Sequence, residues 1–303
     1  MNKLKSMNES SFLKLFMGFI SACFVLAAFL MPDRANAFSG LWQIMSQPGK
    51  ITTNYFHLGG YAATFLNMGL VGFICLGLFV VLKGTANNVS SLAFLLTVGF
   101  SSWGITVLNI WPTILGVALH CIVKGEKLGS RTNAMLFTTG LAPFMSELMV
   151  RYPNPEVVGI HPSGVALALI VGVLVGYFLP AGLDNSPKIH KGFALYSAAL
   201  PVGMTAFLLQ GFLYKAMGLD IPEAVSDLSV SSAFISNTFC IIFFSACIIA
   251  ALAMGCSFRE YAKTLINPQH IVHFGAAYGN AAMLMNVGLY GLYILLYYGI
   301  IGA

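Results

Sequence analysis

The chain has 303 residues and a formal net charge of +5; only 8% of its residues are charged, while 58% are hydrophobic. About a quarter of the residues of a soluble domain are charged, so this composition excludes an ordinary soluble protein and indicates a polytopic membrane protein. The fifteen Lys and Arg residues are scattered in small groups between apolar runs, which is typical of topology signals and argues against nucleic-acid binding.

The N-terminal region, residues 1–37, contains the first apolar run. Three lysines precede the run at 15–31 and Ala35-Asn36-Ala37 follows it, which is also the layout of a cleavable signal peptide. The run is long enough to cross the hydrocarbon core, and further apolar runs follow. We therefore predict a first transmembrane helix at about 12–31 that acts as a signal anchor, with a signal peptide as the alternative.

Crossing the hydrocarbon core takes about 20 apolar residues, and six later runs are close to this length. We predict transmembrane helices at 58–82, 133–150, 163–182, 192–216, 233–255 and 275–302. The stretch 91–123 is too long for one helix and is interrupted by Gly99, Gly104, Pro112 and Gly116. It is predicted to form two short helical pieces joined around 101–104, either as two spans or as a re-entrant hairpin.

The distribution of Lys and Arg tests how often the stretch 91–123 crosses, because these residues concentrate in cytoplasmic loops. If the N-terminus is cytoplasmic and 91–123 enters and returns, eleven basic residues lie inside and four outside. A single crossing leaves six inside and nine outside. We therefore predict a double passage and a cytoplasmic N-terminus.

A short motif occurs twice along the chain. Asn67-Met68-Gly69-Leu70-Val71-Gly72 returns 219 residues later as Asn286-Val287-Gly288-Leu289-Tyr290-Gly291. In the predicted topology the two copies run in opposite directions. Such inverted repeats are the architecture of many secondary transporters, in which broken helices line a solute site near the midplane. We predict an all-α polytopic transmembrane helical bundle with an inverted-repeat plan, with the first repeat at 38–230 and the start of the second at 231–303.

Four segments carry a family resemblance, namely 67–72, 108–117, 141–148 and 190–196. They resemble the bacterial membrane proteins grouped as the domain of unknown function 1576 family, and Asn109-Ile110-Trp111-Pro112 is the most specific part. The resemblance implies two related halves and brings no established activity. Family members tend to carry a Phe-Gly-Lys-like element before this segment, where the present chain has Trp103-Gly104-Ile105-Thr106.

The second repeat is expected to be incomplete. With the spacing of 219 residues, the second copy of the broken stretch falls near 310–342, beyond Ala303. Either the reading frame is truncated or another chain completes the repeat.

Two candidate site residues, Asn109 and Trp111, lie beside Pro112, where the chain is expected to be irregular at membrane depth. Such backbone is tolerated only where it is buried in protein or lines a wet cavity, so its carbonyl and amide groups can serve as solute ligands. The alternative is a proline kink packed by the tryptophan, with no solute involved.

Three further candidates are polar residues within apolar runs. Glu147 is the one carboxylate predicted to lie inside such a run, which makes it a functional candidate, although Arg151 at i+4 offers a simple ion pair near the helix end. Asn67 and Asn286 either form hydrogen bonds between helices or face a solute as a pair about the pseudo-twofold axis.

Small residues recur every four positions along 163–182, at Gly164, Ala168, Gly172 and Gly176. Such a stripe lets a neighbouring helix approach closely. We predict that its role is packing.

We predict a secondary transporter or channel-like permease of the bacterial inner membrane that lies in the lipid bilayer and binds a small polar solute through Asn67, Asn109, Trp111, Glu147 and Asn286. The alternatives are a membrane-embedded enzyme, a non-conducting accessory subunit, or a truncated fragment without function. Phosphate loops, nucleophile elbows, paired catalytic carboxylates and metal-ligand spacings are absent from the sequence. We therefore expect no enzymatic activity, no cofactor, no metal and no nucleic-acid partner. A homo-oligomer or a chain that completes the second repeat is the expected protein partner.

Overall fold

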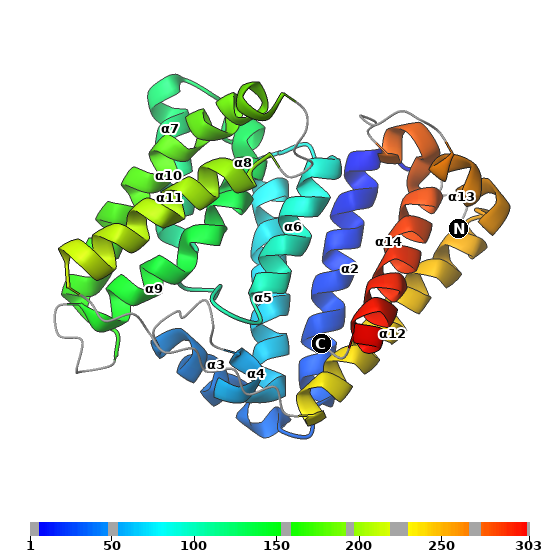
Figure 1. The fold of residues 1–303 in the computed structure, drawn as a ribbon, viewed down its shortest axis with the longest axis horizontal. Helices are drawn as coiled ribbons and strands as arrows, with labels where there is room; N and C mark the ends of the chain where they lie inside the picture. The colour runs from blue at the N-terminus through cyan, green and yellow to red at the C-terminus, as the bar shows by residue number, and fades with distance from the viewer. Residues whose placement is uncertain are drawn as a thin grey trace. The chain divides into compact units, whose positions relative to one another are not determined.

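The computed structural model describes residues 6–47, 54–152, 159–191, 197–218, 230–266 and 274–301; the predicted topology signals at Lys3 and Lys5, and Ala303, lie outside these ranges. Every regular element in the described ranges is a helix, which confirms the predicted all-α class. The chain divides into two compact units that are described separately (Figure 1). The large unit comprises Met17–Thr85 and Leu92–Asp227, and the small unit comprises Met1–Phe16, Ala86–Ser91 and Leu228–Ala303.

Four helices are long and apolar enough to cross a membrane: α2 (Glu9–Leu30), α5 (Gly60–Val81), α10 (Pro162–His190) and the part Ala277–Ile301 of α14 (Phe274–Ile301). A fifth candidate is a pair bent by 103°, formed by the part Asn237–Ala253 of α12 (Val230–Ala253) and by α13 (Phe258–Leu265). These helices lie where the apolar runs predicted them, and their composition fits a membrane protein.

Two predicted spans are not single long helices. The run 133–150 is divided into α8 (Thr132–Thr138), the 3₁₀ turn η3 (Thr139–Leu141) and α9 (Ala142–Arg151). Pro143 lies in the first turn of α9, where its missing N–H is tolerated, and it favours a helix start over a continuous helix. The run 192–216 contains α11 (Ala199–Gly211) followed by the π-helical turn η4 (Phe212–Ala216), and 192–196 lie outside the described residues.

The stretch 91–123 contains the two short helical pieces expected from its sequence. These are α6 (Asn88–Phe100) and α7 (Trp111–Lys124), and an irregular segment at 101–110 joins them. Pro112 lies in the first turn of α7, and Gly125 ends this helix in the left-handed conformation. We call the segment 101–110 the break.

The stripe of small residues on α10 is a packing surface, as predicted. A Cβ atom at Gly176 would overlap the carbonyl oxygen of Thr113 on α7, and one at Gly164 would overlap that of Leu148 on α9. Helices α7 and α9 therefore contact the backbone of α10 directly (Figure 1).

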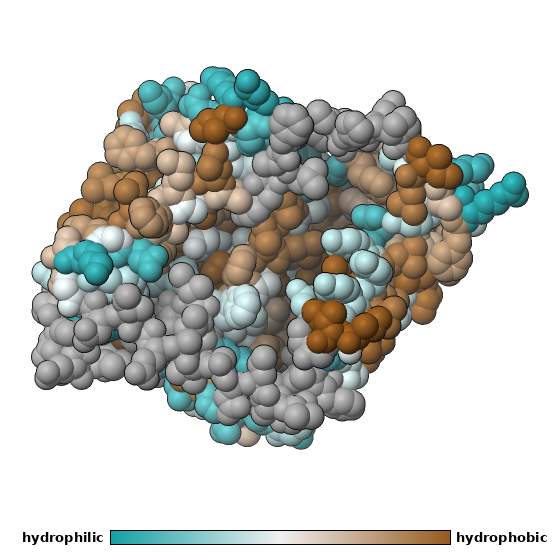
Figure 2. Space-filling view, in the orientation of Figure 1, coloured by the Kyte–Doolittle hydropathy of each residue, from teal (hydrophilic) through white to brown (hydrophobic). Residues whose placement is uncertain are grey.

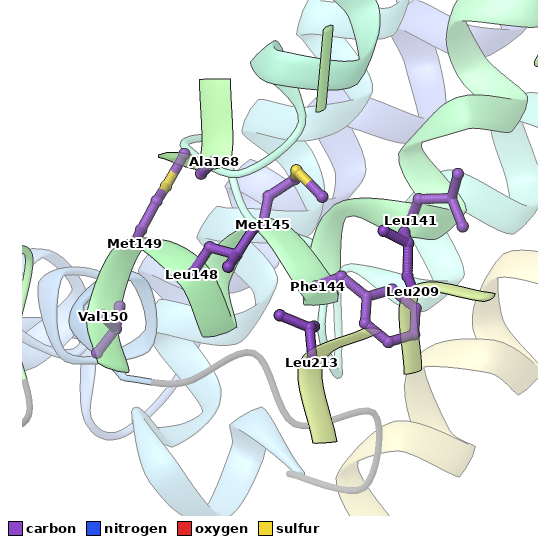
Figure 3. Close-up of a cluster of buried hydrophobic side chains, with 9 residues drawn as sticks. All are labelled: Leu141, Phe144, Met145, Leu148, Met149, Val150, Ala168, Leu209 and Leu213. Atoms are coloured by element: carbon purple, nitrogen blue, oxygen red, sulfur yellow. The ribbon is translucent and has the colours of Figure 1, made fainter. Parts of the chain in front are cut away.

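A buried apolar cluster holds α9 against its neighbours (Figure 3). Its members come from η3, α9, α10, α11 and η4, and they are Leu141, Phe144, Met145, Leu148, Met149, Val150, Ala168, Leu209 and Leu213. Large apolar side chains of α10 and α11, such as Phe178 and Phe207, are exposed. Hydrophobic surface covers this part of the molecule in Figure 2. Exposed apolar surface of this kind fits contact with lipid.

The repeated motif has the same local packing in both units. In the large unit, a Cβ at Gly69 would meet Ser21 and Val25 of α2. In the small unit, a Cβ at Gly288 would meet Phe244 and Ile248 of α12, which lies beside α14 (Figure 1). Two residues that are four positions apart on the neighbouring helix thus pack against each of these two glycines.

The correspondence extends beyond the motif at the same spacing of 219 residues. Gly60 begins α5 with φ +86°, and Gly279 interrupts α14 with φ +83°. Positive φ values in this range favour glycine, so both positions require it. The two segments share a backbone irregularity as well as a sequence motif.

Candidate functional site

Asn67 fastens the break to the middle of α5. Its Nδ2 donates hydrogen bonds to the carbonyl oxygens of Ser101 (2.7 Å) and Ile105 (2.8 Å), and its Oδ1 accepts one from the backbone N–H of Val107 (3.3 Å). The side chain is fully buried. The amide of this one side chain therefore forms hydrogen bonds with three main-chain groups of the break, a segment that lies outside the helices.

The break also carries bonds of its own. Gly104 has a φ of +109°, and the N–H of Ile105 reaches back to the carbonyl oxygen of Phe100 (3.2 Å). The Thr106 hydroxyl accepts bonds from two backbone N–H groups, those of Leu108 and Asn109. The left-handed conformation of Gly104 lets the chain turn sharply between the helices.

Asn109 joins this break to the second interrupted helix. Its Oδ1 accepts a bond from the Thr106 backbone N–H, and its Nδ2 donates to the Gly104 carbonyl oxygen and to Ser146 Oγ, all at 2.8 Å. Ser146 lies in α9, shortly after η3. The break is therefore in direct contact with α9.

These bonds use all side-chain N–H groups of Asn67 and Asn109. Backbone at membrane depth is tolerated outside a helix only when its polar groups are satisfied, and both amides do this for the break. The structure thus gives these two residues a positioning role, and their predicted direct contact with a solute stays a prediction.

Trp111 lies at the first position of α7, and its side chain is exposed. The indole Nε1–H donates to the carbonyl oxygen of Val107 (2.9 Å), one further main-chain group of the break. The exposed indole therefore satisfies a main-chain carbonyl near the end of the break that leads into α7.

Glu147 is the one buried acid among the residues that the structure describes. Its carboxylate accepts a bond from Arg151 Nη1 at 2.8 Å, across one turn of α9. This is the ion pair that the sequence offered as the alternative to a functional role. Glu147 directly follows Ser146, so the pair begins next to the hydroxyl that contacts Asn109.

Asn286 belongs to the small unit. Its Oδ1 accepts a hydrogen bond of 2.7 Å from the Tyr261 hydroxyl of α13. Within the large unit, the structure therefore brings together Asn67, Asn109 and Trp111 at the break, with Glu147 adjacent. Asn286 is described with the small unit alone.

Sequence reasoning missed three residues at the break. The N–H of Tyr55 in α4 (Tyr55–Leu58) donates to the carbonyl oxygen of Ser102 (3.0 Å). The hydroxyls of Thr97 and Thr139 lie 3.1 Å apart beside a cavity of about 20 Å³ that Ile105 also lines, which is room for one water molecule. Nothing in the spacing of these residues signals their meeting, because tertiary packing alone brings them together.

An ion-pair network fixes the other end of α7. Arg131 in the 3₁₀ turn η2 (Leu128–Arg131) binds Glu126 at 2.5 Å and Asp184 of α10 at 2.6 Å. The hydrogen bond from Arg131 lowers the pKa of Glu126, and the bonds to Glu126 and Asp184 raise the pKa of Arg131. The network ties the loop after α7 to α10.

In the described ranges no three His, Cys, Asp or Glu side chains lie close enough to hold a metal ion. Comparison with known families finds that the model described as "Protein of unknown function (DUF1576)" matches residues 33–215. That range contains the break and all of its partners. No curated protein and no solved structure matches the chain.

Proposed function

This chain belongs to the DUF1576 family of proteins of unknown function, and on that premise we propose that it is a multi-pass membrane permease, a secondary transporter or channel for a small polar solute. The observation that carries the proposal is the meeting of two interrupted helices at the Asn109–Ser146 bond. Discontinuous helices of this kind form the solute sites of many transporters.

The break supplies the polar groups that a solute would meet. Main-chain groups of 101–110 lie beside the hydroxyls of Thr106 and Ser146, and the water-sized cavity at Thr97 and Thr139 adds a place for hydration. Trp111 would flank this route at the exposed end of the break.

An uncharged polar solute fits the charges near the break. Glu147, the single buried acid in the described residues, is neutralised by Arg151 and leaves no net charge for a solute ion. Movement would then follow the gradient of the solute or of a coupled ion, without enzymatic chemistry.

We place the chain in the bacterial inner membrane with the N-terminus in the cytoplasm and the two repeats inverted. The excess of Lys and Arg on the proposed inner side supports this orientation. The common packing of Gly69 and Gly288, together with the matching φ of Gly60 and Gly279, supports a duplicated origin of the two segments.

A second candidate function is that of a non-conducting structural subunit. One observation favours it: all side-chain N–H groups of Asn67 and Asn109 are used inside the protein. A residue that only holds the break in place needs partners within the protein for all of its side-chain N–H groups, as these two asparagines have.

A flux assay separates these candidates. Purified protein in liposomes should speed the entry of glycerol or urea, measured by stopped-flow light scattering, above that of protein-free liposomes. Ser146→Ala should change this rate, because it removes the bond to Asn109, whereas Ser130→Ala in the exposed loop should not. Folded protein that passes none of the neutral solutes would support the structural subunit instead.

A further inference from the structure

The surface of α14 differs from that of its counterpart α5 after the motif asparagine. Up to the asparagine the two helices are alike, and Ala62 and Ala281 are both buried. After it, Val71 and Phe79 are fully covered at 0% exposure. The residues 219 positions later, Tyr290 and Tyr298, are 63% and 50% exposed.

The two motif asparagines also differ in the number of hydrogen bonds that they make. Asn67 makes three hydrogen bonds to the break, whereas Asn286 makes one, to Tyr261. Within the part of the chain that the structure describes, the Nδ2 of Asn286 has no acceptor. An amide N–H in hydrocarbon surroundings favours any available acceptor, because leaving it unbonded costs free energy.

The open face of α14 is continuous. Asn286, Tyr290, Tyr293 and Tyr297 follow one another at helical spacing and share one side of the helix. The stripe extends over about 16 Å of helix, which is longer than the headgroup zone that an aromatic belt occupies. Tyrosine combines a large apolar surface with a hydroxyl and is enriched in protein interfaces.

We propose that this stripe is the docking surface for a second membrane polypeptide, which contributes an interrupted apolar helix. The occupant presents main-chain carbonyl oxygens to Asn286 Nδ2, as Ser101 and Ile105 present theirs to Asn67. A second copy of this chain cannot supply them from its own break, because its Asn67 already binds them. The proposal does not depend on permease activity.

Photo-crosslinking of the full chain in the membranes of its own cells tests the proposal. The photoreactive residue benzoylphenylalanine replaces Tyr293, and mass spectrometry identifies the peptide that becomes attached on irradiation. We expect an apolar segment of a different protein, interrupted by Gly or Pro. A crosslinker in place of Ile242, exposed on α12, serves as the control and should capture lipid only.

A second measurement tests whether the yield of the crosslinked adduct depends on Asn286. Asn286→Leu should lower the adduct yield roughly fivefold, since the donor is lost. Tyr261→Phe, which removes only the bond to Oδ1, should leave the yield nearly unchanged. An adduct with a second copy, with lipid alone or with an uninterrupted helix would overturn the proposal, as would a yield that is independent of Asn286.

Discussion

The Nδ2 of Asn109 donates a hydrogen bond of 2.8 Å to Ser146 Oγ, and this single contact joins the break between α6 and α7 to the interrupted helix α8–α9. The two residues are 37 positions apart in the chain. The bond fixes the Asn109 side chain, whose other hydrogen bonds satisfy main-chain groups of Thr106 and Gly104, and so helps the irregular backbone of the break to persist away from water.

Asn67→Leu should destabilise the protein by roughly 2 kcal/mol. The side chain keeps a similar volume, but two carbonyl oxygens and one N–H of the break lose their partner in a buried place, where each loss costs about 1–3 kcal/mol in water-soluble proteins and less in membranes. Unfolding in mixed detergent micelles measures the change. Asn185→Leu, which removes only two exposed bonds within α10, should stay within about 0.5 kcal/mol. Equal effects of the two substitutions would contradict the role of Asn67 in holding the break.

Gly176→Ala should weaken the contact of α10 with α7. The new methyl group would overlap the Thr113 carbonyl oxygen, which belongs to the backbone and cannot turn aside, so the helices must separate at a cost of about 1–3 kcal/mol. Thermal melting in detergent reports the loss. The matched control is Gly203→Ala on α11, which meets no atom within 4 Å and should be neutral or stabilising by up to about 1 kcal/mol. A melting temperature of Gly176→Ala as high as that of the control would disprove the close approach.

The long helices could be predicted from the sequence because burial in lipid requires apolar runs of a set length, and α2, α5 and α10 follow that rule. The break could also be predicted, since Gly104 and Pro112 oppose a continuous helix. The partners of Asn67 and Asn109 could not, because hydrogen bonds over 34 to 38 positions depend on how helices pack. Within 133–150, Pro143 indicates a bend in the helix, and the structure starts α9 at this proline.

The Glu126–Arg131 contact should make stability depend on pH on the acid side. The hydrogen bond from Arg131 lowers the pKa of Glu126, so the contact stabilises the folded state above the unfolded pKa of about 4.3, and this contribution is lost as the pH falls through the lower folded value. The melting temperature of the wild type should therefore fall between about pH 5 and pH 3 by more than that of Glu126→Gln. Lys127→Gln, a neighbouring charge change without this bond, should keep the wild-type slope. Parallel curves for wild type and Glu126→Gln would refute the assignment.

Glu147 and Arg151 should be far less sensitive to joint replacement than to single replacement. Glu147→Met removes the carboxylate that pairs with the largely buried guanidinium of Arg151, and breaking a buried pair in this way costs about 3–5 kcal/mol. Replacing both by Met removes the two charges together, and such exchanges are often neutral, so we expect a stability close to that of the wild type. Unfolding of the two single variants and the double variant measures the coupling between the residues.

The same double variant tests what the pair does in a permease. If Glu147 and Arg151 only hold α9 in place, as their contact across one helical turn indicates, glycerol or urea flux in liposomes should stay near the wild-type rate. We expect this result, because a neutral pair of Met side chains leaves the Asn109–Ser146 contact intact. A folded double variant that loses flux would instead assign Glu147 to the solute route, because stability and conduction would then have been separated in one protein.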